Sequence, residues 1–158
     1  MLDMPQNQIF LVIDGEEPLG RAIVEALFYQ GDITKSSDVE QALNADERTV
    51  TIVLHMVSHV IKAPEALPAK VNIEVTRALL AACRLAGVER FVYTSSASVI
   101  YSGPELEYVD ESIEYSTGLT DYYLQTKATA EKMVLGYDYT LRMRTTALRL
   151  PVVIGTGD

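Results

Sequence analysis

Apolar, β-rich runs alternate along this chain with segments whose apolar residues recur at helical spacing. The runs read IFLVI, TVTIVLH, RFVYTS and TTALRL and lie at residues 9–13, 49–55, 90–95 and 145–150. Helices are predicted over residues 19–28, 37–43, 70–86 and 121–135. Continuous apolar runs are typical of strands buried on both faces of a sheet. The alternation therefore predicts an α/β fold, with a mostly parallel, doubly wound sheet and helices on both of its faces.

Local signals mark the ends of three of these helices. Ser37 and Glu40 have the spacing of a capping box at the start of the second helix. Gly87 and Gly136 lie where the third and fourth helices are expected to stop. Residues 97–119 lack a periodic pattern and are expected to form a loop. The 158 residues are enough for one domain.

Charge and composition exclude several classes of function. The chain has 13 basic and 22 acidic residues, a net charge of −9, and the acidic excess disfavours nucleic acid and anionic membranes. The single cysteine, Cys83, excludes an internal disulfide, and with only His55 and His59 beside it we expect no metal site. The longest apolar stretch, residues 50–61, is much shorter than a membrane span of roughly 20 residues. Because the first residues are polar, unlike a signal peptide, the sequence predicts a cytoplasmic protein.

A tyrosine and a lysine on the last predicted helix form the clearest chemical signal. Tyr123 and Lys127 are four residues apart, so they project from one helix face. A lysine ammonium beside a phenol favours the phenolate, which can exchange a proton with a hydroxyl near neutral pH. Ser96 follows the third strand, at the sheet edge where ligands bind, and its hydroxyl could hold a substrate oxygen. The set suits carbonyl–alcohol interconversion with a hydride-carrying cofactor.

Each of these residues also has a purely structural interpretation. Tyr–Lys pairs at this spacing are common on exposed helices, and serines after strands are ordinary turn residues. Cys83 and Met133 are interpreted as core residues, and His55 as a strand-end histidine bonded to backbone. The combination of Ser96, Tyr123 and Lys127 in a βαβ chain is what favours function.

Four segments resemble the extended branch of the short-chain dehydrogenase/reductase superfamily. They are residues 71–100, 109–112 (VDES), 121–135 (DYYLQTKATAEKMVL) and 145–158 (TTALRLPVVIGTGD). The Tyr-x-x-x-Lys signature is Tyr123-Leu-Gln-Thr-Lys127, and its TKA-x-AE continuation is most similar to the 3β-hydroxysteroid dehydrogenase and sterol-4α-carboxylate 3-dehydrogenase group. The resemblance implies a Rossmann-like fold, an NAD or NADP cofactor and a 3β-hydroxysteroid or sterol-like substrate, with no nucleic-acid partner. It is also compatible with a homodimer and, in full-length relatives, with a peripheral location at the endoplasmic reticulum.

The resemblance also implies a role for individual residues. Ser96 corresponds to the serine that holds the substrate oxygen, Tyr123 to the catalytic acid/base and Lys127 to the residue that tunes it. Asn72 corresponds to an asparagine that supports this set from a neighbouring helix. The residues implied to bind the cofactor are Gly15, Gly20, Asp32, Ile33, Tyr123, Lys127, Leu150, Pro151 and Val153.

The sequence departs from the family pattern at three places. The first strand is followed by Asp14, Glu16 and Glu17 where a glycine-rich turn normally approaches the pyrophosphate, and these carboxylates oppose an anion. The region of the second family strand is shortened, so residues 28–33 either form a strand or end a helix at Gly31, and the sheet is expected to be incomplete. The chain ends just after the fourth strand, so we expect the C-terminal region that covers the substrate to be absent.

Three functions therefore remain open. One is a dehydrogenase acting on the CH–OH group of a sterol-like alcohol, with either NAD or NADP. Another is a non-catalytic Rossmann-fold relic or interaction module that has lost cofactor binding, which Asp14 and Glu17 favour. The last is a different enzyme of the same superfamily, a nucleotide-sugar epimerase or a flavonoid-type carbonyl reductase, which would share Ser96, Tyr123 and Lys127.

Overall fold

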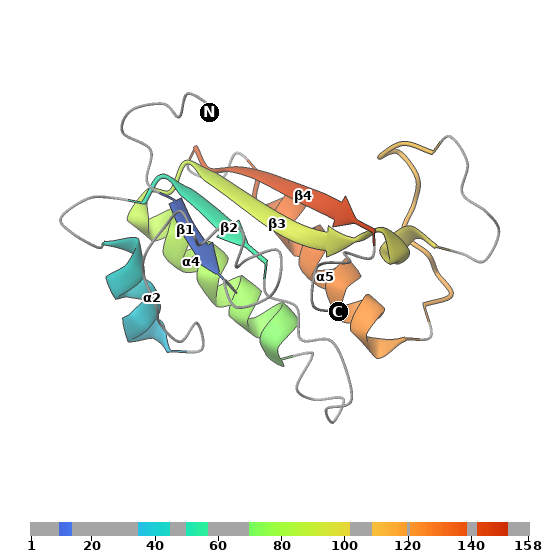
Figure 1. The fold of residues 1–158 in the computed structure, drawn as a ribbon, viewed down its shortest axis with the longest axis horizontal. Helices are drawn as coiled ribbons and strands as arrows, with labels where there is room; N and C mark the ends of the chain where they lie inside the picture. Colours follow the sequence, from blue (N-terminus) through green and yellow to red (C-terminus); the bar gives the residue numbers. More distant parts are fainter. Residues whose placement is uncertain are drawn as a thin grey trace, which may run out of the picture.

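A four-stranded parallel sheet forms the centre of the molecule (Figure 1). The computed structural model describes residues 10–13, 35–44, 50–56, 70–101, 109–119, 121–138 and 142–151. The strands are β1 (Phe10–Ile13), β2 (Ile52–His55), β3 (Arg90–Ser96) and β4 (Arg144–Leu150), in the order β1-β2-β3-β4. All neighbouring strands pair in parallel, with Ile13 opposite His55 and His55 opposite Tyr93. The predicted parallel sheet is confirmed.

Helices α4 (Thr76–Ala86) and α5 (Tyr122–Gly136) cover one face of this sheet (Figure 1). The π-helix η2 (Lys70–Val75) continues into α4, α2 (Ser36–Leu43) packs against α4, and the 3₁₀-helix η3 (Ala97–Ile100) follows the end of β3. The β2–β3 and β3–β4 crossovers step in the same direction, so right-handed connections place α4 and α5 on the same side. The predicted helix over residues 19–28 and the segment 28–33 lie outside the described residues, so helices on the second face stay a prediction.

The helix ends agree with the sequence at α4 and α5 but not at α2. Gly87 caps α4 with a positive φ of 78°, and its N–H donates to the carbonyl of Cys83, as expected for a left-handed stop. Gly136 is the last residue of α5. The predicted capping box at Ser37 is wrong, because the Ser37 hydroxyl donates to Asp38 and the N-cap of α2 is Lys35, without a side-chain cap. Residues 97–100, expected in a loop, form the 3₁₀-helix η3.

Two hydrophobic clusters hold the helices to the sheet. The larger one lies between the sheet and α4 and α5; its fully enclosed members include Val53, Leu79, Leu80, Cys83, Phe91, Tyr93, Ala130 and Val134. Cys83 is buried as predicted, and Met133 is partly buried against this cluster. The smaller cluster joins Val99 and Ile100 of η3 and Ala128 of α5 to Ile113, Tyr115 and Leu119. It attaches the segment 109–119 to the carboxyl end of β3.

Candidate active site

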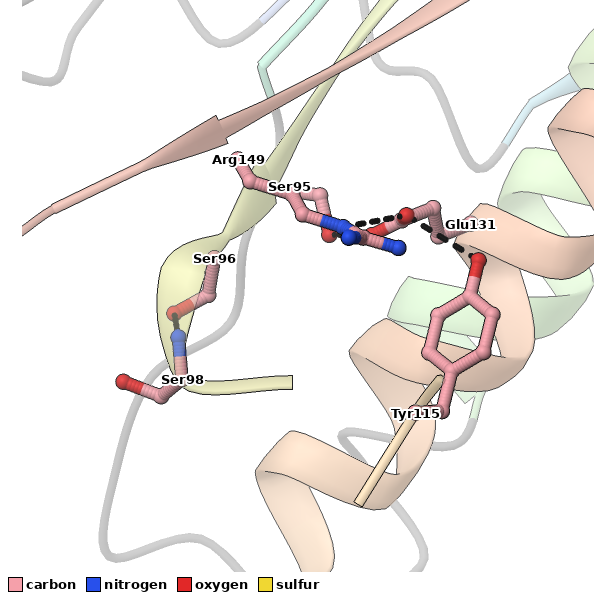
Figure 2. A network of polar contacts seen from close by, with 6 residues as sticks. All are labelled: Ser95, Ser96, Ser98, Tyr115, Glu131 and Arg149. Carbon is pink, nitrogen blue, oxygen red and sulfur yellow. Dashed lines mark hydrogen bonds and ion pairs between the residues drawn. The ribbon is translucent and has the colours of Figure 1, made fainter. Parts of the chain in front are cut away.

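Ser96 is the last residue of β3 and the N-cap of η3. Its Oγ accepts a hydrogen bond from the backbone N–H of Ser98 at 3.2 Å, as Figure 2 shows. This bond starts η3 and holds the serine side chain at the carboxyl edge of the sheet. It uses an acceptor lone pair of the hydroxyl, so the O–H can still donate to another oxygen. The structure therefore puts Ser96 at the sheet edge where ligands of parallel sheets bind.

Helix α5 carries Tyr123, Lys127 and Glu131 at intervals of four residues, so the three side chains share one face. The helix starts at Asp121, whose carboxylate accepts from the backbone N–H of Tyr123 at 2.7 Å. Lys127 and Glu131 are each only 1 % exposed, whereas Tyr123 is half-buried. The face therefore changes from a partly open tyrosine to fully enclosed charged groups.

The Lys127 ammonium lies inside the protein with specific partners. Its Nζ donates to the backbone carbonyl of Thr94 at 2.6 Å and lies 4.4 Å from the centre of the Tyr93 ring. Both contacts stabilise a cation that is buried away from water, because the carbonyl oxygen and the face of the aromatic ring each carry partial negative charge. Burial raises the pKa of the Tyr93 phenol, and Tyr123 and Glu131 nearby raise it further.

His55 ends β2 beside this lysine. Its Nε2 is 2.8 Å from the hydroxyl of Thr76, so the expected backbone partner is wrong and a side chain of α4 takes that place. The ring also lies against Phe91 and Tyr93. Burial lowers the pKa of His55 to about 3, and the positive charge of Lys127 adds to the effect. His55 is therefore neutral at neutral pH and leaves the positive charge of this region to Lys127.

Asn72 lies in η2, on the helix next to α5. It is 1 % exposed, and its Nδ2 donates to the Thr126 hydroxyl at 3.0 Å. The same hydroxyl donates to the carbonyl of Tyr123 at 2.7 Å. π-helical segments are rare and often lie at functional sites. Through Thr126, Asn72 is connected to the turn of α5 between Tyr123 and Lys127.

Only part of the expected cofactor site is described. Leu150 is the half-buried last residue of β4, and Pro151 is exposed directly after it. The other expected cofactor residues and the acidic turn lie outside the described residues; they are Asp14, Gly15, Glu16, Glu17, Gly20, Asp32, Ile33 and Val153. The interpretation of the acidic segment after β1, which departs from the family pattern, therefore rests on the sequence alone.

A network around Glu131 was missed by the sequence analysis (Figure 2). The Glu131 carboxylate accepts a short hydrogen bond from the Ser95 hydroxyl. It also accepts from the Tyr115 hydroxyl at 3.0 Å and from Nε of Arg149 at 2.9 Å. Burial acts to lower the pKa of Arg149, but its bond to Glu131 contributes to a net rise. The sequence could have indicated Glu131 itself, because it follows Lys127 by four residues and so shares its helix face. No sequence pattern indicates Ser95, Tyr115 or Arg149 as its partners.

A shallow depression lies beside the Glu131 network. Its volume is about 460 Å³, and it is lined by Glu111, Ile113, Glu114, Tyr115, Lys132, Leu135 and Arg149. Within the described ranges, no group of three or more His, Cys, Asp or Glu side chains is arranged to hold a metal ion. None of the helices in the described part of the chain is long and apolar enough to cross a bilayer.

Comparison with known proteins identifies the family of this chain. The sequence model of the 3-beta hydroxysteroid dehydrogenase/isomerase family matches residues 14–158. The chain is 35% identical to the sterol-4-alpha-carboxylate 3-dehydrogenase (decarboxylating) of Saccharomyces cerevisiae, over 98% of this chain and 45% of that protein. It is 37% identical to the 3-beta-hydroxysteroid dehydrogenase of Mycolicibacterium neoaurum, over 81% of this chain and 36% of that protein.

A solved structure supports the same assignment. A short-chain dehydrogenase/reductase superfamily protein from Agrobacterium tumefaciens, solved with bound NAD, has a TM-score of 0.77 and 28% identity. The match covers 90% of this chain and 48% of that one. The chain spans less than half the length of the two curated relatives above. On the family match and the shared fold, the chain belongs to the 3-beta hydroxysteroid dehydrogenase/isomerase family.

Proposed function

We propose that this chain is the coenzyme-binding and catalytic part of a dehydrogenase that oxidises the 3β-hydroxyl of a sterol-like alcohol, or catalyses the reverse reduction. One observation carries the proposal. Tyr123 and Lys127 lie on the face of α5 that packs on the carboxyl half of β3, and Ser96 ends that strand. The substrate class rests on the two curated relatives, which are named for sterol and steroid substrates.

In the oxidative direction, Ser96 and Tyr123 would act on the same substrate oxygen. The Ser96 O–H donates to this oxygen, while the backbone N–H of Ser98 holds the serine in place. The Tyr123 phenolate takes the proton of the substrate hydroxyl. Lys127 favours the phenolate, because a buried positive charge one helical turn away stabilises a negative oxygen.

The described residues fit a nicotinamide coenzyme, which supplies the hydride acceptor when bound. The Lys127 ammonium donates to the Thr94 carbonyl, and an ammonium group is also suited to a ribose hydroxyl, with the Tyr123 hydroxyl beside it. Leu150 and Pro151 provide an apolar end of β4 for the nicotinamide ring. The Agrobacterium tumefaciens protein, which has NAD bound, supports this assignment.

Replacing Tyr123 tests the proposal. We expect the wild-type chain to oxidise a 3β-hydroxysteroid in the presence of NAD or NADP, with formation of reduced coenzyme measured by absorbance. Tyr123→Phe removes only the hydroxyl, so it should lower kcat by at least about 10²-fold while coenzyme affinity stays near that of the wild type. A circular dichroism spectrum checks that the variant is folded. Wild-type turnover that survives this change would refute the role of Tyr123.

The acidic turn after β1 favours a second candidate, a coenzyme-free member of the family that acts as an interaction module. Asp14, Glu16 and Glu17 stand where the family pattern has a glycine-rich turn. A coenzyme titration followed by thermal shift separates the two functions. The absence of any shift with millimolar NAD(H) and NADP(H) would favour the second candidate.

A further inference from the structure

The carboxylate of Glu131 joins four separate parts of the chain beside the candidate active site. It belongs to α5, and its partners are Ser95 at the end of β3, Arg149 at the end of β4 and Tyr115 of the segment 109–119. These contacts span 36, 18 and 16 residues along the sequence. Glu131 is 1 % exposed and its contact with Ser95 is buried, and a hydrogen bond to a charged group has a larger effect away from water.

The contact with Ser95 bears directly on Ser96. Successive residues of a strand point to opposite faces, so Ser95 faces α5 and Ser96 leaves the strand at the start of η3. Figure 2 shows Ser95 directed toward Glu131 and Ser96 directed toward Ser98. Fixing the Ser95 side chain on α5 therefore fixes the position of Ser96 relative to the helix that carries Tyr123 and Lys127.

The other partners hold the carboxylate and the segment in front of α5. The guanidinium of Arg149 and the ammonium of Lys132 lie 5.1 Å and 4.4 Å from the centre of the Tyr115 ring. One residue further, the backbone N–H of Ser116 donates to the carbonyl of Val99 in η3 at 3.0 Å. The segment 109–119 is thus bonded both to α5 and to the helix that Ser96 begins.

We propose that Glu131 is a positioning residue, which holds Ser96 in register with Tyr123 through Ser95 and thereby sets the geometry of the substrate oxygen. The proposal rests on the proposed function for its catalytic part and on the hydrogen bonds alone for its structural part. Glu131 does not touch the reacting atoms. Its contribution is to hold β3 and α5 together, two elements that are far apart along the chain.

Two substitutions at Glu131 separate its geometry from its charge. Glu131→Met has a similar volume and no acceptor, so it removes all three hydrogen bonds. Because it leaves Arg149 without its carboxylate, it should also lower stability, and a circular dichroism spectrum checks that the variant is folded. Glu131→Gln keeps an oxygen for Arg149 and Tyr115, and its amide can donate to the Ser95 oxygen. We expect Glu131→Met to lower kcat about 10- to 100-fold, with KM and coenzyme affinity changed less than about 2-fold. We expect Glu131→Gln to restore most of this loss.

Hydrogen exchange provides a readout that does not require activity. In Glu131→Met and in Ser95→Ala, the amides of Ser98 and Ser116 should exchange at least about 10-fold faster, while those of α4 stay unchanged. Glu74→Met is the matched control, because it removes a carboxylate that pairs with Arg77 on the exposed surface. It should change neither kcat nor exchange at Ser98.

The outcomes of the two readouts are distinct. A wild-type chain without turnover would contradict the proposed function, and the exchange rates would then decide whether Glu131 positions the end of β3. Unchanged exchange at Ser98 and Ser116 in both Glu131→Met and Ser95→Ala would overturn the positioning role, whether or not the chain is active. An equal loss of kcat in Glu131→Gln and Glu131→Met would also overturn it, because geometry would then not be what matters.

Discussion

Helices α4 and α5 pack side by side on the same face of the sheet, but they bury different chemistry (Figure 1). The buried side chains of α4 are Thr76, Leu79, Leu80 and Cys83, which are almost entirely apolar. Those of α5 are Thr126, Lys127, Ala128, Ala130, Glu131 and Val134. Two charged side chains are thus fully enclosed under α5, whereas none of the fully buried side chains of α4 is charged.

This difference indicates that the two helices serve different purposes. Buried apolar groups stabilise a fold in proportion to the area removed from water. A buried charge contributes little or nothing to stability, because the loss of its hydration cancels the gain from its partners. Lys127 and Glu131 nevertheless have specific partners on β3, β4 and the segment 109–119. We infer that α4 maintains the fold and that α5 maintains an arrangement of polar groups.

The largest change in stability is expected from the apolar helix. Leu80 is fully buried, so Leu80→Ala should lower the free energy of unfolding by about 2–5 kcal/mol, through lost burial and the cavity that remains. Leu85→Ala is the matched control on the same helix, because Leu85 is 79% exposed and should change stability by less than about 0.5 kcal/mol. Urea unfolding measures both. Equal losses from the two substitutions would contradict the assigned packing of α4.

A smaller effect is expected from His55 of β2, which is bonded to Thr76 of α4 and interacts electrostatically with Lys127 of α5. Its pKa is 6.5 when unfolded and about 3 when folded, so the unfolded chain binds its proton first as the pH falls. Folding is then disfavoured progressively between these two values, by about 2 kcal/mol at pH 5. His55→Gln can keep a hydrogen bond to Thr76 without titrating.

Urea unfolding of both proteins at neutral pH and at pH 5 measures this contribution. The stability lost between the two pH values should be about 2 kcal/mol smaller in His55→Gln than in the wild type. His59 is present in both proteins, so any contribution it makes cancels in the comparison. An identical pH dependence would show that His55 is not held neutral in the folded state.

Much of the fold could be predicted from local patterns. The apolar runs located all four strands within a few residues. Gly87 marked the end of α4, because the residue that ends this helix has the left-handed conformation that glycine adopts most easily. The spacing of Tyr123 and Lys127 correctly put both on one helix, since a repeat of four residues is a local property. No comparable local signal identified the π-helix η2 or the 3₁₀-helix η3.

The partners of the buried polar groups could not be predicted, because they come from distant parts of the chain. Ser95 and Glu131 are 36 residues apart, and His55 and Thr76 are 21 residues apart. Their contacts depend on how the crossovers stack α4 and α5 on the sheet. The wrong backbone partner of His55 and the missed Glu131 network have this same origin.

The central claim is that the buried Lys127 is kept for coenzyme chemistry and not for stability, and Lys127→Met tests it most directly. Removing the charge removes the cost of burying an ammonium group away from water, while the Thr94 carbonyl loses its hydrogen-bond donor. These two effects oppose each other, so the unfolding free energy should change by no more than about 1 kcal/mol. Coenzyme affinity should fall about 10- to 100-fold, which corresponds to one charged hydrogen bond.

Paired urea unfolding and coenzyme titration of the wild-type and Lys127→Met chains measure the two quantities together. The account predicts nearly unchanged stability with weakened coenzyme binding. A loss of stability of about 3 kcal/mol or more, with coenzyme affinity equal to that of the wild type, would contradict it.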